Sequence, residues 1–122
     1  MKLNRGLIVK ANLGSARGNS IQAGTRPVVI VSNNRCNNHS KVISVVPLTA
    51  RVYEKKELPT HVLLKSDEQI GLKTDSLALC EQVTLLPVSA IINPHYGQVT
   101  ESGMDEITKA LQVQLGVFDE YN

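Results

Sequence analysis

One arginine stands between a glycine-containing loop and an apolar run, and this setting suits the binding of an anion. Residues 22–31 read Gln-Ala-Gly-Thr-Arg-Pro-Val-Val-Ile-Val, so Arg26 is followed by Pro27 and then by four β-branched residues. Because proline starts a strand or lies at its edge, we expect Arg26 at the junction of loop and strand, fixed by the sheet backbone. Its planar fork of N–H donors matches a phosphate group.

Charge is segregated along the chain. Eight basic residues and no Asp or Glu precede Glu54, whereas Lys109 is the only base among seven acidic residues after Lys73. The formal net charge is only +2, but a basic half of this kind indicates a surface for phosphate or nucleic acid. A solvated basic face without a ligand is the alternative. On charge alone, Arg17, Arg35 and Lys41 are candidate phosphate contacts.

The chain is long enough to bury one core of its own. Its 122 residues with a hydrophobic share of 42% predict a single domain over residues 1–122. The N-terminus lacks the apolar core of a signal peptide and no run reaches membrane-spanning length, so we expect a cytoplasmic protein with reduced Cys36 and Cys80. Cys36 and His39 could be half of a metal site, but no second ligand pair accompanies them. We expect no metal and no cofactor.

Short β segments separated by turns must position these residues. Strands are expected over 6–13, 28–32, 41–49, 58–64 and 75–86, with an exposed loop over 14–24 and a polar turn over 33–40. Pro47 should break or bulge the third strand, which leaves Thr49 at its end. Five or more short strands predict a barrel or a sandwich.

The last segment follows a helical pattern. Met104, Ile107, Leu111 and Leu115 recur at helical spacing. Ser102 and Asp105 approximate a capping box, and Gly116 is placed to end the helix. We therefore expect a mainly β fold, with minor α, whose barrel carries one C-terminal amphipathic helix.

Common catalytic motifs are absent from the sequence. It contains neither a phosphate loop of the Walker type nor a Gly-x-Ser-x-Gly elbow. The histidines at 39, 61 and 95 are widely separated, so no acid–base pair can be read from them. We expect His61 to lie in a strand and to be structural.

Several weak landmarks occur in one order along nearly the whole chain. They are Arg5-Gly6, the segment 22–28, Asn33-Asn34, the segment 45–49, the segment 58–62, Asp75-Ser76 and Glu81-Gln82-Val83. Together they resemble the MazF/PemK/Kid toxins of bacterial type II toxin–antitoxin pairs, which are sequence-selective endoribonucleases. The resemblance implies an SH3-like or CcdB-like small β-barrel that forms a homodimer and is inhibited by an acidic antitoxin.

The resemblance also implies roles for individual residues. Arg26 and Thr49 correspond to the family's catalytic pair, which acts without metal on single-stranded RNA. In these enzymes the 2′-hydroxyl attacks the adjacent phosphorus and leaves a 2′,3′-cyclic phosphate and a 5′-hydroxyl. We favour charge stabilisation for Arg26, because a guanidinium does not readily release a proton. The candidate RNA contacts are Ser20, Gln22, Arg17, Asn33 and Gln82.

Two residues depart from the family's usual pattern. Ile21 stands where the family often has glutamate, and Asn12 where it commonly has aspartate. A catalytically weakened family member is therefore one alternative. Another is a non-catalytic poison or nucleic-acid-binding module on the same barrel. The gyrase poisons related to CcdB end in Trp-Gly-Ile, whereas this chain contains no Trp, which argues against that target.

Overall fold

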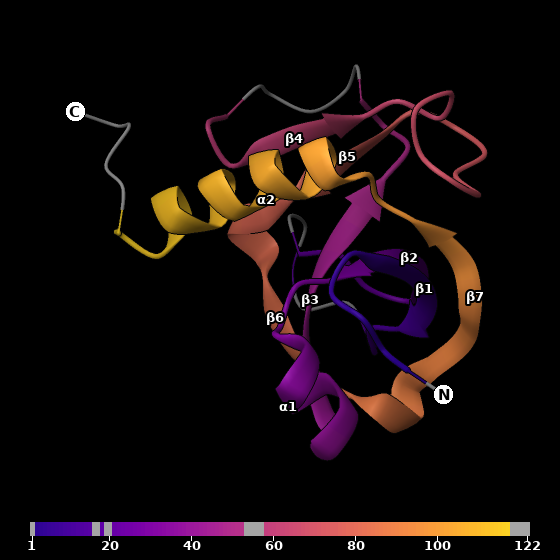
Figure 1. The fold of residues 1–122 in the computed structure, drawn as a ribbon. Helices are drawn as coiled ribbons and strands as arrows, with labels where there is room; N and C mark the ends of the chain where they lie inside the picture. Colours follow the sequence, from indigo (N-terminus) through magenta and orange to yellow (C-terminus); the bar gives the residue numbers. More distant parts are fainter. Residues whose placement is uncertain (1, 16–17, 19–20, 53–57, 118–122) are drawn as a thin grey trace.

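The computed structural model describes residues 2–15, 18, 21–52 and 58–117, and these residues form seven strands, two α-helices and two 3₁₀ helices (Figure 1). The strands are β1 (Leu7–Asn12), β2 (Thr25–Ile30), β3 (Val42–Thr49), β4 (His61–Leu64), β5 (Ser76–Leu79), β6 (Thr84–Pro87) and β7 (Ile91–Gln98). The helices are α1 (Asn34–His39) and α2 (Glu101–Gln114), with 3₁₀ turns η1 (Cys80–Gln82) and η2 (Val88–Ala90).

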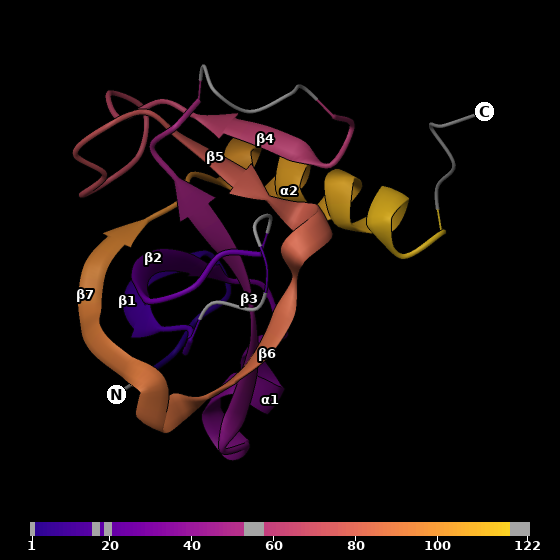
Figure 2. The same cartoon turned by 180° about the vertical axis from the view of Figure 1, so that it is seen from behind.

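The strands form one antiparallel sheet that curls around its own core. Their order is β4-β5-β3-β2-β1-β7, and β6 pairs with β3. Figures 1 and 2 show β6 and β7 curving along opposite sides of the central strands. An isolated bridge from Ile70 to Gln98 links the loop after β4 to the end of β7. The predicted mainly β fold is confirmed, but the sheet is not closed by strand pairing among the described residues, so it is a barrel only loosely.

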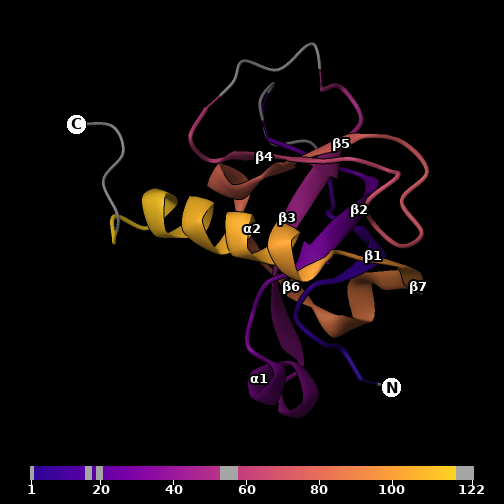
Figure 3. The ribbon, with the colours of Figure 1, turned by 45° about the horizontal axis from the view of Figure 1, so that its top comes forward.

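The three central strands are buried on both faces. Side chains alternate across a strand, so Ile8 and Val29 join one core cluster while Val9 and Val28 join the other. The first cluster contains Met104 and Ile107 of α2, which packs against β4 and η1 (Figure 3). This double burial explains why the strands read as nearly continuous apolar runs.

Two prolines lie inside strands, contrary to the expected positions. β2 begins at Thr25, so Arg26 is already within the strand and pairs with Ala11 of β1, whereas a loop junction was predicted. Pro27 is accommodated because the pairing of β2 with β3 begins only at Val28. Pro47 does not break β3 either: it falls between the stretch that pairs with β6 and the stretch that pairs with β5. Both prolines therefore lie where a partner strand is missing on one side.

The polar turn predicted over 33–40 is wrong, because this segment contains the helix α1. Asn33 caps the helix by accepting a hydrogen bond from the backbone N–H of Cys36 at 2.8 Å. Asn37 is buried, and its side-chain amide donates to the carbonyl oxygen of Ser32 at 2.8 Å. Asparagine disfavours helices only weakly, and these local hydrogen bonds outweigh that preference.

The C-terminal helix is confirmed, but its N-cap is not the predicted one. Thr100 caps α2 through a hydrogen bond of 3.1 Å from the backbone N–H of Gly103 to its hydroxyl. At the other end Gly116, at φ +75°, follows the C-cap Leu115 as predicted. The strand β7, which contains Pro94, was not predicted from the sequence. As the edge strand beside β1, β7 tolerates a proline.

Candidate functional site

Arg26 is held through one nitrogen of its guanidinium, and its two terminal amino groups point to a role in binding a ligand. The side chain is half-buried on β2, and its Nε donates to the carbonyl oxygen of Ala23 at 2.8 Å. This hydrogen bond holds the plane of the group. Within the described residues the two terminal amino groups make no hydrogen bond, so their donors remain for an anion.

Thr49 ends β3, the strand next to β2 in the sheet. The β2–β3 ladder ends at the pair Val28–Pro47, so Arg26 and Thr49 each lie two residues beyond that end on their own strands. Thr49 pairs with Leu77 of β5. The Thr49 side chain is buried, and its hydroxyl accepts a hydrogen bond of 3.3 Å from the backbone N–H of Arg51.

Two of the predicted RNA contacts are in direct contact with each other. The side-chain oxygen Oε1 of Gln82 in η1 accepts a hydrogen bond of 2.8 Å from the backbone N–H of Gln22. Gln22 lies four residues before Arg26, so this bond joins η1 to the loop that leads into β2. Among the described residues, the Oε1 atom of Gln22 is itself buried without a hydrogen-bond partner.

A cavity of about 450 Å³ opens next to this contact. Its polar lining includes Asn12, Gln22, Gln82 and Thr84, and its apolar lining includes Ile21 and Leu85. Arg26 and Thr49 do not line it, but Pro47, two residues before Thr49, does. The volume and mixed lining suit a flat organic group such as a nucleobase.

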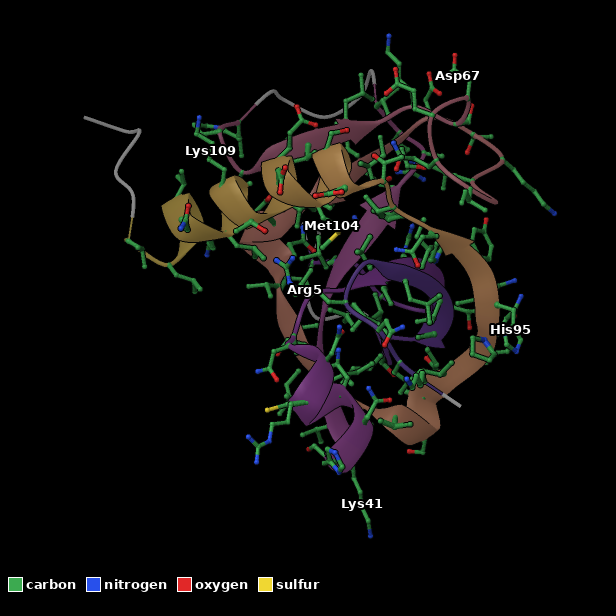
Figure 4. The ribbon with its side chains drawn as sticks, viewed as in Figure 1. Arg5, Lys41, Asp67, His95, Met104 and Lys109 are labelled. Carbon is green, nitrogen blue, oxygen red and sulfur yellow. The ribbon has the colours of Figure 1, made fainter. Side chains whose placement is uncertain are left out.

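The structure separates Asn33 from the other candidates. Asn33 follows the far end of β2, seven residues after Arg26, and at strand spacing this is roughly 20 Å. Its side-chain oxygen is occupied in capping α1. Arg35 lies on α1, and Lys41 projects beyond that helix, away from α2 (Figure 4). RNA contacts by these three residues stay predictions, and Arg17 and Ser20 fall outside the described residues.

One base of the acid-free half has a structural role that charge alone did not reveal. Nε of Arg5 donates to the carbonyl oxygen of Val31 at 2.9 Å, and its Nη2 donates to the hydroxyl of Thr108 at 2.7 Å. Figure 4 shows Arg5 lying beneath α2, near Met104. This arginine fastens the helix to the strands, and two of its N–H donors are committed to the fold.

Next to Gln82, its neighbour Glu81 belongs to a polar cluster that was not predicted from the sequence. His61 lies in a strand as predicted, although β4 begins at this residue and not at Leu58, and its Nε2 donates to Oε2 of Glu81 at 2.8 Å. The hydroxyl of Thr60 donates to the other carboxylate oxygen of Glu81 at 3.2 Å. The signal was available, because both Thr60-His61 and Glu81-Gln82 are landmarks of the resemblance.

Two titratable groups near this region are set by local structure. Burial, reinforced by the charge of Glu81, raises the pKa of the Cys80 thiol to about 12, so Cys80 is a neutral core residue and not a nucleophile. The backbone N–H and the hydroxyl of Ser66 lower the pKa of the Asp75 carboxyl. The Asp75 carboxylate therefore stabilises the loop between β4 and β5 by accepting both hydrogen bonds from Ser66.

Neither a metal centre nor a membrane span is evident in the part of the chain that the structure describes. There, no three His, Cys, Asp or Glu side chains come together as a metal site would require. None of the helices formed by the described residues is both long enough and apolar enough to span a membrane. Cys36 and Cys80 are both free, the former exposed and the latter buried.

Comparison with known proteins gives one sequence family and a set of related structures. Residues 4–115 match the family described as PemK-like, MazF-like toxin of type II toxin-antitoxin system. An endoribonuclease solved with its cognate antitoxin from Mycobacterial species is similar, with 25% identity, a TM-score of 0.75, and coverage of 94% of this chain and 96% of that one.

Two further structures share the fold at lower identity. MazF from Deinococcus radiodurans has a TM-score of 0.78 at 19% identity, covering 95% of this chain and 98% of its own. The Mycobacterium tuberculosis toxin MazF-mt6 has a TM-score of 0.71 at 22% identity, covering 89% and 95% respectively. The match extends over the β-strands and α2 alike, since nearly the whole of each chain is included.

Proposed function

The chain belongs to the PemK-like, MazF-like toxin family of type II toxin–antitoxin systems, and on this premise we propose that it is a sequence-selective endoribonuclease acting on single-stranded RNA. The observation that carries the proposal is the guanidinium of Arg26, which is fixed through Nε while its terminal donors stay uncommitted among the described residues. A positioned cation of this kind stabilises the charge that develops on a phosphate during cleavage.

The proposed reaction needs no metal. The 2′-hydroxyl of one nucleotide loses its proton as its oxygen forms a bond to the adjacent phosphorus. The bond from phosphorus to the 5′-oxygen breaks, and the 5′-oxygen gains a proton, so the proton count is unchanged. A 2′,3′-cyclic phosphate and a 5′-hydroxyl result. Arg26 would stabilise the nonbridging oxygens with two donors, and Thr49 would add a hydroxyl donor from the neighbouring strand. We assign the general base to no residue.

The proposed partner is an acidic antitoxin acting on a homodimer in the cytoplasm. The toxin of one similar structure is bound to its cognate antitoxin, and the first 53 residues of this chain contain no carboxylate side chain to repel an acidic segment. Carboxylates of an extended antitoxin tail would compete with RNA phosphates for Arg26. Inhibition should therefore be tight but weakened by salt.

One experiment tests activity, metal dependence and selectivity together. Purified protein is incubated with a long RNA in EDTA, and the new ends are mapped and analysed chemically. We expect cuts at a short recurring sequence, with 2′,3′-cyclic phosphate and 5′-hydroxyl ends, and none from the Arg26→Ala protein. Intact RNA, or cuts that persist in the variant, would contradict the proposal.

A weakened enzyme is the second candidate, and Ile21 is the observation that favours it. This residue is 45% exposed and lines the cavity beside Gln22, so a carboxylate at that position could reach a bound RNA. Ile21→Glu should then raise the cleavage rate, with Ile21→Gln as the uncharged control. Equal rates for the native protein and both variants would remove this candidate.

A further inference from the structure

We propose that Glu81 and His61 are positioning residues for Arg26 and act on it through Gln82 and the loop before β2. Neither residue touches the arginine. A continuous chain of hydrogen bonds and peptide links nevertheless joins them to it, and it runs from β4 through η1 to the start of β2. The effect on cleavage rests on the proposed function, whereas the structural link can be tested without any RNA.

The first link fixes η1 against β4. Both carboxylate oxygens of Glu81 are held, one by the Thr60 hydroxyl at 3.2 Å and one by Nε2 of His61 at 2.8 Å. The His61 side chain is only 5% exposed and Thr60 is fully buried. The backbone N–H of Cys80 also donates to the carbonyl oxygen of Thr60 at 3.0 Å. A carboxylate held by two buried donors has little freedom to move.

The second link passes from η1 to the loop. Gln82 follows Glu81 directly, and its Oε1 accepts the backbone N–H of Gln22 at 2.8 Å. Because η1 is a single 3₁₀ turn of three residues, fixing the side chain of Glu81 also restricts the backbone from which Gln82 extends. Gln82 can hold Gln22 in one place only while η1 stays in place.

The third link reaches the guanidinium. Ala23 follows Gln22, and its carbonyl oxygen accepts the hydrogen bond from Nε of Arg26 at 2.8 Å. Gln82 therefore holds one residue of the loop, and the next residue orients the arginine. Displacing a catalytic group by about 1 Å can reduce a rate about a hundredfold, so small movements of Ala23 matter.

His61 has no other evident role in the described structure. Its Nδ1 is buried without a hydrogen-bond partner among the described residues, so a leucine would fill a similar space and remove only the hydrogen bond to Glu81. Holding Glu81 is thus the specific contribution of the imidazole. A matched pair of variants follows: His61→Leu removes the donor, whereas His61→Gln keeps an N–H at a similar distance from the backbone.

The structural link is tested by amide hydrogen exchange in the free protein. In His61→Leu we expect the Gln22 amide to exchange about tenfold faster, the scale for losing one hydrogen bond, while amides in β1 and α2 keep their rates. His61→Gln should resemble the native protein. Unchanged exchange at Gln22 in a folded His61→Leu protein would overturn the proposal, and Thr60→Val repeats the test if that protein does not fold.

The catalytic consequence is tested with a double-mutant cycle. His61→Leu should lower kcat about tenfold with KM changed by less than about twofold, because orientation matters chiefly in the transition state. Combined with Gln82→Ala, it should cost nothing further, since both act through one link. Additive losses would overturn the proposal. If the native protein cleaves no RNA, the proposed function fails, but the exchange measurement still decides the link.

Discussion

Polar side chains lie near both ends of β2, but their hydrogen bonding differs. At the end that begins with Thr25, the terminal donors of Arg26 are uncommitted among the described residues. Beyond Ile30, the side chains of Asn33 and Asn37 are occupied in forming and holding α1. We therefore expect a ligand at the first end, whereas the polar side chains at the second end hold the fold.

Arg26 and Arg5 show the same contrast between two guanidinium groups. Each donates through Nε to a backbone carbonyl, but Arg5 also spends a terminal donor on Thr108 of α2. The formal charge of the two residues is identical. The two arginines differ in that one terminal amino group of Arg5 has a hydrogen-bond partner, whereas neither of Arg26 has one among the described residues. Folding decides this difference.

The largest effect is expected for Arg26. Arg26→Ala should reduce cleavage about a hundredfold or more, the scale for losing a preorganised charge donor, while the melting temperature stays close to the native value. Arg26→Lys keeps the charge without the planar fork and should recover only part of the rate. Gel-based cleavage and thermal melts measure both. An active Arg26→Ala protein would break the contrast between the two ends.

The opposite result is expected for Arg5. Arg5→Ala should lower the free energy of unfolding by about 2 kcal/mol, because two hydrogen bonds of a charged group are lost. At a temperature where the variant is folded, kcat should be unchanged. Urea unfolding checks the first statement, and cleavage below the transition checks the second. An Arg5→Ala protein that is stable but inactive would mean that both arginines contribute to RNA cleavage.

Thr49 should show a smaller catalytic defect than Arg26. Thr49→Val preserves the branched shape at this buried position and removes the hydroxyl, so we expect a loss of about tenfold in kcat, as befits a neutral donor. Thr49→Ser restores the hydroxyl and should restore most of the rate. Equal losses in both variants would point to packing and not to the hydroxyl.

Asn33 should matter for stability alone. Asn33→Ala removes the N-cap of α1 and should cost about 1 kcal/mol, which for a chain of this size is a shift of about 4 °C in the melting temperature. Asn33→Asp keeps a capping oxygen and should stay near the native value. A change in which RNA sequence is cut would instead support the predicted RNA contact.

The smallest effects are expected for the two bases at the α1 end. Neutralising a true phosphate contact lowers the slope of log Kd against log salt by about one. Charge alone predicts Arg35 and Lys41 as such contacts, but both lie at the α1 end of the molecule. We therefore expect Arg35→Ala and Lys41→Ala each to change that slope by much less than Arg26→Ala does. Binding of a noncleavable RNA at several salt concentrations measures this. Equal slopes for all three variants would extend the RNA site along the whole of β2.

Sequence patterns predicted the central strands and α2 because double burial and amphipathicity leave regular apolar spacing. The predictions of secondary structure failed for α1 and β7, where tertiary contacts override the conformational preferences of the individual residues. The helix α1 depends on Asn33 and Asn37 finding specific partners, and β7 depends on lying at an edge that tolerates Pro94. Neither condition is visible in the residue types themselves.

The candidate site was predictable in part. Order and spacing of landmarks singled out Arg26, Thr49, Gln22 and Gln82, and folding brings Gln22 and Gln82 into contact. The support from Glu81 and His61 was not predicted, because the two residues are 20 positions apart and only the packing of β4 on η1 joins them. Charge counting likewise could not show that Arg5, one of the eight bases before Glu54, fastens α2 to the strands.

The most direct test of which end of β2 binds RNA is amide chemical-shift mapping with a 2′-O-methylated copy of a cleaved segment. This RNA binds but cannot be cleaved through a 2′-hydroxyl. We predict shifts at Gln22, Ala23, Arg26, Thr49 and Gln82, which weaken in Arg26→Ala. Shifts confined to α1 and its flanking residues would contradict it.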